Sequence, residues 1–427
     1  MQLLLEKFVA GTWQAAANLT IETPQHGISS ACIVEYLPEY ALAYLDAKGE
    51  PALSANLPVS FHHQRLPHWP PFLLDILPSG FGRELLVVQQ KLPQPDGPHN
   101  DSTLLALGAS NPVGNLRVAQ AHNWLLMQLP ETNQGWQLED MSRHDADFIE
   151  YAQTHGTLVA GTSTQGQAAK LWITQKGDAL YYADILVPDD EAIAHYLIKI
   201  PRNERDANLL KHELYWLQLA KKAGLNVHGE PFMAGGLLFI PRFDRVLKNH
   251  GVHRRAVESV FSLLGIAAHA QSLRYEDIIE TWIKHADISW LGIDLLEYLQ
   301  RDILGYCLRV EDNHGRNTAF FLGQQGIQLT PLFDFSPMFL ADDPPARATL
   351  WRQFPLGNHI QWPCLFHRWL PDIIGIENTE ALRSQLGQWQ PRLAETYAEF
   401  MQLDLDPRTS ICHQRFQTVL KVFDALR

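Results

Sequence analysis

A run of polar and charged residues at 312–317 (DNHGRN) lies between an apolar helical stretch and an apolar hairpin that leads to Asp334. Burial beside such flanks costs several kcal/mol per charge unless a metal ion or a phosphate compensates it. A turn at 323–326 would bring Asp334 back to this loop. With Asp312 and Asn317, it offers the hard oxygen ligands that Mg²⁺ prefers. The set suits phosphoryl transfer, in which one Asp acts on the attacking hydroxyl while an Asn and a second Asp hold the metal.

A lysine in a predicted strand could supply the cation that such a site needs. Lys199 lies in the apolar run 196–201 (YLIKIP) and precedes a predicted helix that carries Glu213. A strand lysine is usually an edge residue that reaches water. A strand lysine followed by a helix glutamate is, however, the order found in protein kinases. Lys199 is therefore a candidate contact for nucleotide phosphates, with Glu213 as its supporting partner.

A turn rich in small residues, GTSTQGQAAK at 161–170, leads into the strand that is predicted next. Gly161 and Gly166 allow a phosphate to approach the backbone closely, and Lys170 adds positive charge. The turn matches neither the Walker pattern nor Gly-x-Gly-x-x-Gly, and the hydrolase pattern Gly-x-Ser-x-Gly fails at Gln165. The turn alone does not distinguish a phosphate-binding loop from an ordinary connection.

Three blocks of predicted secondary structure would position these residues. Residues 1–135 show short strands, expected at 30–37 and 40–46, followed by an apolar helical stretch. Residues 136–245 alternate strands with one long helix, and residues 246–427 are mostly helical. The sequence thus predicts an α+β fold, with an N-terminal α/β domain followed by a bilobal, protein-kinase-like arrangement of a sheet-rich lobe and a helical lobe.

The long helix of the middle block is expected at 206–225. Asp206 would cap its first turn, and Leu210, Leu214 and Leu217 recur at helical spacing. Gly224 would take the left-handed position that ends many helices.

The composition of the chain is that of a folded protein. Of its 427 residues, 46% are hydrophobic and 19% are charged. The length is enough for two or three domains of about 100 to 200 residues each. No apolar run is long enough to span a membrane and the first residues lack a basic leader, so we expect a cytoplasmic protein without membrane contact. The net charge of −13 argues against autonomous nucleic-acid binding, which leaves DNA contact only through a protein partner.

The motifs resemble, in identity, order and spacing, those of the HipA-like serine/threonine kinases, the toxin components of bacterial toxin–antitoxin pairs. The resemblance runs nearly from end to end and implies an N-terminal HipA-like domain followed by the two kinase lobes. It is carried by the segments STQGQAAK at 163–170, IKIP at 198–201, HE at 212–213, RFDR at 242–245, DNHGRN at 312–317 and FDFS at 333–336.

The resemblance implies a role for each motif. Asp312 would be the catalytic base, and Asn317 and Asp334 would complete the catalytic set and hold Mg²⁺. Ser163 would be an autophosphorylation site, whose phosphate would expel the loop from the nucleotide site and silence the kinase. The residues expected at ATP are Gln165, Gly166, Gln167, Ala168, Ala169, Lys170, Lys199, Pro241, Arg242, Phe243, His314, Gly315, Arg316, Asn317, Phe333 and Asp334.

The chain departs from the family pattern at three positions without losing a catalytic group. Gln165 and Gln167 replace smaller residues, which would affect the stiffness or the resting position of the loop. Arg316 replaces a common lysine, which keeps the charge but changes its geometry. Relatives act on aminoacyl-tRNA synthetases and bind a small HipB-like DNA-binding antitoxin, so the resemblance implies both as partners. Two alternatives stay open: a weakly active or inactive module that mainly binds the antitoxin as co-repressor, and a kinase for a small molecule or lipid.

Overall fold

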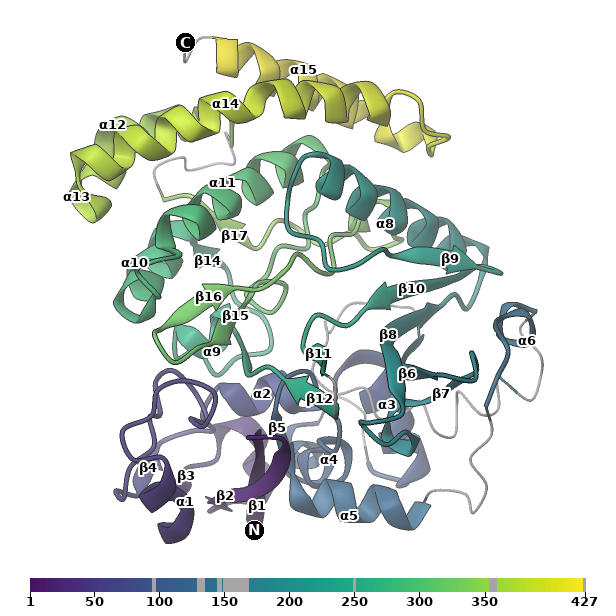
Figure 1. Ribbon diagram of the computed structural model, residues 1–427, viewed down its shortest axis with the longest axis vertical. Helices are drawn as coiled ribbons and strands as arrows, with labels where there is room; N and C mark the ends of the chain where they lie inside the picture. The colour runs from purple at the N-terminus through teal and green to yellow at the C-terminus, as the bar shows by residue number, and fades with distance from the viewer. Residues whose placement is uncertain are drawn as a thin grey trace.

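The computed structural model describes residues 1–93, 97–128, 135–143, 148, 169–248, 251–352 and 359–424. Within these residues two five-stranded sheets, three smaller sheets and numerous helices occur together (Figure 1). The predicted α+β class is confirmed. In the described part of the chain, no helix is long and apolar enough to cross a membrane.

The first sheet has the strand order β4-β3-β2-β1-β5 and is antiparallel throughout. Apolar side chains of its strands and of the helices that follow form one buried cluster, which includes Leu5, Leu19, Val34 and Leu105. The elements of this region are β1 (Gln2–Val9), β2 (Thr12–Ile21), β3 (Cys32–Tyr36), α1 (Pro38–Ala43), β4 (Gln64–Leu66), α2 (Phe72–Ile76), α3 (Gly80–Gln89), α4 (Asp101–Gly108), β5 (Leu116–Val118) and α5 (Ala119–Gln128).

The strand expected at 40–46 is wrong, because the chain forms helix α1 there. Pro38 lies in the first turn of α1, where its fixed φ and missing N–H suit a helix. Tyr36, Tyr40 and Tyr44 are four residues apart, and their rings contact one another with centroids 6.1 and 4.8 Å apart. The apolar alternation in this segment therefore reflects a helical face rather than a strand.

The second sheet has the order β7-β6-β8-β10-β9, and all its pairs are antiparallel. Its strands are β6 (Ala169–Lys176), β7 (Tyr181–Ala183), β8 (Ala192–Ile200), β9 (Phe232–Ala234) and β10 (Leu237–Pro241). Helix α6 (Leu138–Ser142) precedes them in the chain. In β6 and β8, Lys170 pairs with Lys199, Trp172 with Leu197 and Thr174 with His195. Since side chains alternate along a strand, these six lie on one face of the sheet.

Helix α8 (Glu204–Lys222) follows β8 and covers this sheet. The predicted cap is wrong: Asn203, not Asp206, caps α8, with its side chain accepting the N–H of Asp206 at 2.9 Å. Asp206 instead lies inside the first turn and accepts from Arg202. Gly224 has φ +85°, so the expected left-handed helix end is correct.

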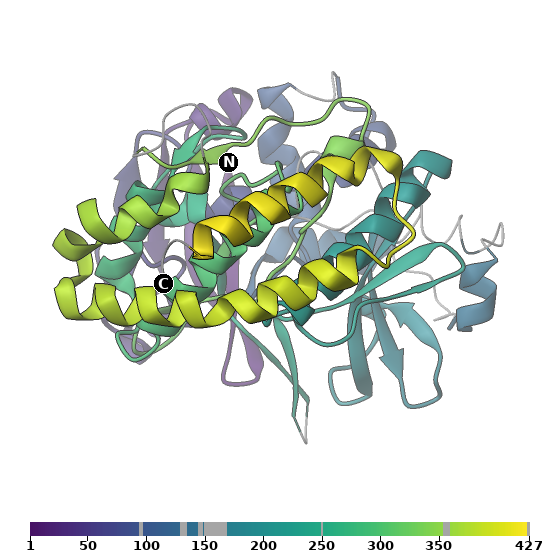
Figure 2. The ribbon, with the colours of Figure 1, turned by 90° about the horizontal axis from the view of Figure 1, so that it is seen from above.

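The remaining residues build a mostly helical region around the largest apolar cluster. Figures 1 and 2 show α14 and α15 lying side by side over α11. The elements are β11 (Arg245–Lys248), β12 (Gly251–Arg254), β13 (Val257–Ser259), α9 (Val260–Leu263), β14 (Leu273–Arg274), α10 (Tyr275–His285), α11 (Leu291–Cys307), β15 (Ala319–Leu322), β16 (Ile327–Leu329), β17 (Thr349–Leu350), α12 (Leu365–Arg368), α13 (Leu370–Ile374), α14 (Ile376–Phe400) and α15 (Ser410–Asp424). The domain boundaries near 135 and 245 stay a prediction.

Candidate active site

The loop at 308–318 connects α11 to β15 and carries Asp312 and Asn317. Helix α11 is anchored in the core by apolar residues at helical spacing. The start of α9 then fixes the loop, because Val260 N donates to Thr318 O at 3.0 Å and Phe261 N donates to Gly315 O at 3.3 Å. A side chain at 315 would come within 2.9 Å of the Phe261 ring, so only glycine allows this close contact.

The hairpin of β15 and β16 returns the chain to the same place, as the turn at 323–326 predicted. It is followed by Asp334, which has a positive φ of +49°. Such a backbone conformation costs free energy in a residue other than glycine and is concentrated at functional sites. The conformation of Asp334 therefore indicates a functional role for its carboxylate.

Three buried charged groups, Lys170, Lys199 and Glu213, lie around Asp334, and we call these four residues the pocket cluster. Lys199 Nζ donates to Glu213 Oε1 at 2.6 Å and also to Asp334 Oδ1. Lys170 Nζ lies 3.6 Å from Asp334 Oδ2 and, among the described residues, has no hydrogen-bond partner. Two lysines from neighbouring strands therefore converge on a single carboxylate.

The pKa values in the pocket cluster differ in direction. Burial would raise the pKa of Asp334, but Lys170 and Lys199 outweigh burial and hold this pKa below its usual range. For Lys199, burial would lower the pKa, but Asp334 and Glu213 raise it above its usual range. Burial lowers the pKa of Lys170 because its partners compensate only in part. Lys170 is thus the charged group with the least compensation from the protein itself.

Asp312 is also buried, and it lines a cavity together with Asn317, His314 and Asp334. Burial raises the pKa of Asp312, His314 opposes this shift and Asp334 adds to it. His314 Nε2 lies 3.5 Å from Asp312 Oδ1, and burial lowers the pKa of His314. Asn317 Nδ2 donates to the Asp312 carbonyl at 2.7 Å, which leaves Asn317 Oδ1 without a partner among the described residues.

A second pocket lies beside the pocket cluster, with about 930 Å³ of space between its lining residues, part of which is open to solvent. We call it the central pocket. Its apolar lining comes partly from the face of the second sheet that carries Trp172 and Leu197, and partly from the segments after β10 and β16. The lining includes Trp172, Leu197, Leu217, Val227, Ile240, Pro241, Phe243, Leu332 and Phe333, together with the polar residues Asp75, His228, Arg242, Asp244, Ser259, Arg316 and Asp334.

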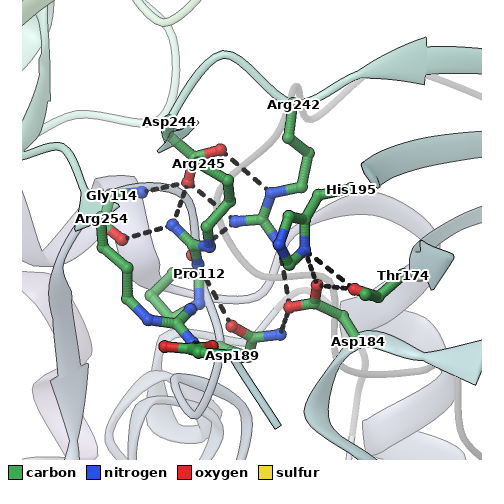
Figure 3. A network of polar contacts seen from close by, with 11 residues as sticks. Pro112, Gly114, Thr174, Asp184, Asp189, His195, Arg242, Asp244, Arg245 and Arg254 are labelled. Atoms are coloured by element: carbon green, nitrogen blue, oxygen red, sulfur yellow. Dashed lines mark hydrogen bonds and ion pairs between the residues drawn. The ribbon is translucent and has the colours of Figure 1, made fainter. Parts of the chain in front are cut away.

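At the far end of the sheet face, a second group of buried charges holds β10, β6 and β8 to the N-terminal region. We call Thr174, Asp184, His195, Arg242, Asp244 and Arg245 the hinge network (Figure 3). Asp244 accepts from Gly114 N at 2.8 Å and from both arginines, and Asp184 accepts from Asn111, Thr174, His195 and Arg242. The guanidinium of Arg242 also stacks on Trp172, 4.0 Å from the ring centroid.

The sequence matches the family description "HipA-like C-terminal domain" over residues 162–381, just over half of the chain. The chain belongs to the HipA-like family. The resemblance stated from the motifs is thereby confirmed for family membership. A comparison with curated proteins found no match.

The fold of this HipA-like protein is also similar to that of a solved HipA. Over 99% of this chain and 97% of the other, it matches HipA of the Shewanella oneidensis MR-1 toxin–antitoxin system, solved with HipB and its operator DNA. The TM-score is 0.64 at 16% sequence identity. A second similar structure is the Helicobacter pylori proinflammatory kinase CtkA, with a TM-score of 0.37 at 11% identity over 54% of this chain and 87% of that one.

The HipA-like protein brings together most of the residues singled out from the sequence. Lys170, Lys199 and Glu213 meet Asp334, while Asp312, His314, Gly315 and Asn317 line the adjoining cavity with Phe333. Ser163 and the predicted contacts Gln165, Gly166, Gln167 and Ala168 lie outside the described residues. Ala169 is the first residue of β6.

Two predicted nucleotide contacts have side chains that are already engaged in the HipA-like structure. Arg242 borders the central pocket, but its guanidinium donates into the hinge network. The Arg316 guanidinium donates to the carbonyls of Ala268 and His269 at 2.6 and 2.7 Å and lies 4.9 Å from the Phe261 ring centroid. Any contact of Arg242 or Arg316 with a nucleotide would therefore compete with existing bonds.

Sequence reasoning missed Asp75, which lies in the N-terminal region yet lines the central pocket of the HipA-like fold. The available signal was a single acidic residue inside the apolar run FLLDIL. It also missed His228 at the pocket wall and gave no role to Asp244, although the motif RFDR contains it. These residues approach the site only through contacts between segments far apart in the sequence.

Proposed function

We propose that this HipA-like protein is a Mg²⁺-dependent kinase that transfers the γ-phosphate of ATP to a serine or threonine of another protein. The observation that carries this proposal is the pocket cluster, in which Lys199 joins Glu213 to Asp334 while Lys170 stays without a hydrogen bond among the described residues. A buried ammonium without a partner is costly, and phosphate oxygens would supply what it lacks.

The central pocket would receive the nucleoside of ATP. The rings of Phe243 and Phe333 lie 5.4 Å apart at its border, and Trp172 and Leu197 add apolar surface from the sheet. Apolar walls with few polar groups are typical of sites for flat, aromatic ligands. Pro241 and the backbone up to Phe243 would border the base, and Lys170 and Lys199 would pair with the phosphates.

Asn317 and Asp334 would hold the Mg²⁺ ion. Asn317 Oδ1 lacks a partner in the described residues, and the carboxylate of Asp334 is kept ionised by two lysines, so both oxygens fit a hard cation. Three or more His, Cys, Asp or Glu side chains placed to hold a metal do not occur in the described ranges. The ion would take its other ligands from phosphates and water. When bound, Mg²⁺ would neutralise charge on the transferred phosphate.

Asp312 would act on the acceptor hydroxyl. Its buried carboxylate lines the same cavity as Asp334 and its pKa is raised, which makes it a better proton acceptor than an exposed aspartate. As the hydroxyl oxygen bonds to the γ-phosphorus and the bond from that phosphorus to ADP breaks, the hydroxyl proton would pass to Asp312. His314, 3.5 Å away, would orient this carboxylate.

The partners we propose follow from the family. The solved Shewanella protein is bound to HipB and its operator DNA. We propose that this chain likewise binds a HipB-like antitoxin, reaches DNA only through it, acts in the cytoplasm, and has an aminoacyl-tRNA synthetase as its protein substrate. Ser163 is the proposed site of autophosphorylation. The net charge of −13 agrees with DNA contact through a partner.

Incubation of the purified protein with γ-labelled ATP and Mg²⁺ tests the proposal. We expect label on the protein itself or on an added synthetase, and we expect Asp312→Asn to remove it. A matched control is Asp287→Asn, which changes an aspartate that accepts from Ser289 and Gln328. Label found only in a lipid or metabolite fraction, or nucleotide binding without any transfer, would contradict the proposed reaction.

A further inference from the structure

The N-terminal region contacts the site through Asp75, which lines the central pocket. This residue lies in α2, and both oxygens of its carboxylate bind one residue of the helical region. Ser259 Oγ donates to Asp75 Oδ1 at 2.6 Å, and Ser259 N donates to Asp75 Oδ2 at 2.9 Å. Asp75 and Ser259 both line the central pocket. A carboxylate that accepts two hydrogen bonds from one residue fixes the position and orientation of that residue.

Ser259 is in turn bound to the loop that carries Asp312. It is the last residue of β13, where it pairs with Ala319 of β15, and its hydroxyl caps α9 by accepting Ser262 N at 3.2 Å. The next two residues, Val260 and Phe261, donate their N–H groups to the carbonyls of Thr318 and Gly315. Displacement of Ser259 would therefore displace the second half of the loop, from Gly315 to Thr318.

Arg316 provides a second connection between Asp75 and the loop. The charge of Arg316 lowers the pKa of Asp75, although burial raises this pKa by more. The guanidinium of Arg316 is held against Phe261 and the carbonyls of Ala268 and His269. The negative charge of Asp75 thus favours the observed placement of a cation inside the loop.

The residue before Ser259 is anchored to the N-terminal region as well. Glu258 is buried and accepts from Ala55 N at 2.8 Å and from the hydroxyl of Ser54, and Ser262 Oγ donates to it at 2.6 Å. Strand β13 is therefore hydrogen-bonded to two separate segments of residues 1–135, one at Ser54 and Ala55 and one at Asp75. The N-terminal region forms part of the support of the loop.

We propose that Asp75 is a positioning residue for the catalytic loop, so that the N-terminal region is a working part of the active site. It acts through its two hydrogen bonds with Ser259 and does not itself touch the reacting atoms. This inference rests on the proposed kinase function only for its effect on rate. Its structural half, the restraint of residues 308–322, can be measured without any reaction.

The test combines hydrogen exchange of the peptide 308–322 with steady-state phosphate transfer, using the full-length protein. In Asp75→Asn, one of the two Ser259 donors loses its acceptor, so we expect faster exchange in this peptide and a fall in kcat of about tenfold. The milder variant Ser259→Ala, which keeps the backbone donor, should change both quantities in the same direction. The double variant should lose no more than the stronger single variant, since both act on one contact.

The matched control is Glu50→Gln. Glu50 also belongs to the N-terminal region, but it pairs with His253 of β12 at 2.9 Å and not with a residue of β13. It should leave exchange and kcat unchanged. The inference is overturned if exchange is unchanged in Asp75→Asn and Ser259→Ala, or if Glu50→Gln speeds exchange equally. It is also overturned if the losses in the double variant are additive, or if an active protein shows faster exchange without a loss of kcat. A wild-type protein that transfers no phosphate contradicts the proposed function instead, and the exchange data still decide the restraint.

Discussion

Residues of the pocket cluster and of the hinge network lie on the same face of one sheet, but the two groups differ in how completely the protein hydrogen-bonds their buried charges. Lys170 and Thr174 belong to β6, Lys199 and His195 to β8, and the paired Trp172 and Leu197 lie between the two groups. Each carboxylate of the hinge network accepts several hydrogen bonds from the protein. In the pocket cluster, Lys170 makes no hydrogen bond to a described residue.

The difference indicates what each group of charges is for. His195 Nε2 and Arg245 Nε in the hinge network also lack partners among the described residues, but these side chains donate through their other nitrogens. Lys170 has only one nitrogen. A charge cluster completed by the protein holds strands together, whereas one left incomplete is ready for a ligand.

The largest expected effect is on activity and concerns Asp312, which lines a cavity with Asp334 of the pocket cluster. Asp312→Asn should lower kcat by about 1000-fold, because the amide cannot accept the hydroxyl proton. The same change should not lower the melting temperature, because burial already disfavours the charged form of Asp312 and raises its pKa. Transfer of labelled phosphate and thermal unfolding measure the two quantities. A variant that lost stability and activity in parallel would show that Asp312 serves the fold.

The hinge network should respond in the opposite way. Asp244→Asn removes a charge placed between Arg242 and Arg245 and should lower the free energy of unfolding by about 3 kcal/mol. Burial would raise the pKa of Asp244, but the two arginines lower it well below its usual range, which shows that the charged form is favoured. Denaturant unfolding measures the change. Full stability with lost nucleotide binding would contradict a structural role for the network.

A smaller effect is expected at Lys170. Lys170→Met should weaken ATP binding by about tenfold without lowering the melting temperature, because the fold disfavours the charged form of this lysine. Lys176→Met is the matched control at the other end of β6, where the lysine pairs with Glu191 near the surface. Calorimetric titration should find weaker binding only in the first variant. Equal affinity in both variants would remove Lys170 from the nucleotide site.

The smallest effect is a pH dependence. Only the ionised carboxylate of Asp312 can accept a proton, and burial raises its pKa above the usual value. The rate should therefore fall as the pH is lowered, and this fall should begin at a higher pH than an exposed aspartate would give. Measurement of kcat from about pH 8 to about pH 5 tests this. A rate that rose on acidification would assign the base to another group.

The comparison also shows why some features could be predicted from the sequence. The fold class and the family followed from motifs that keep their order, and strand β8 and helix α8 follow from local patterns of apolar residues. The pair of Lys199 with Glu213 was expected because a strand lysine followed by a helix glutamate is the order found in protein kinases, and the hairpin was expected to return Asp334 to the loop.

Features that depend on contacts between distant segments were missed. Arg242 was expected at the nucleotide, yet its guanidinium donates to Asp184, to Asp244 and to the carbonyl of Pro112 in the N-terminal region. Asp75 has no sequence neighbour that reveals its contact with Ser259, 184 positions further on. The helix α1 was missed because a short apolar alternation fits both a strand and a helical face.

The most direct test of the central claim is a calorimetric titration of ATP into the protein with and without Mg²⁺. We predict binding that is weakened at least about tenfold when Mg²⁺ is omitted, and weakened to a similar degree in Asn317→Ala with Mg²⁺ present. Thermal unfolding should show that Asn317→Ala is folded. Binding of ATP that is unaffected by Mg²⁺ and by Asn317→Ala, or no binding at all by the wild-type protein, would contradict the account.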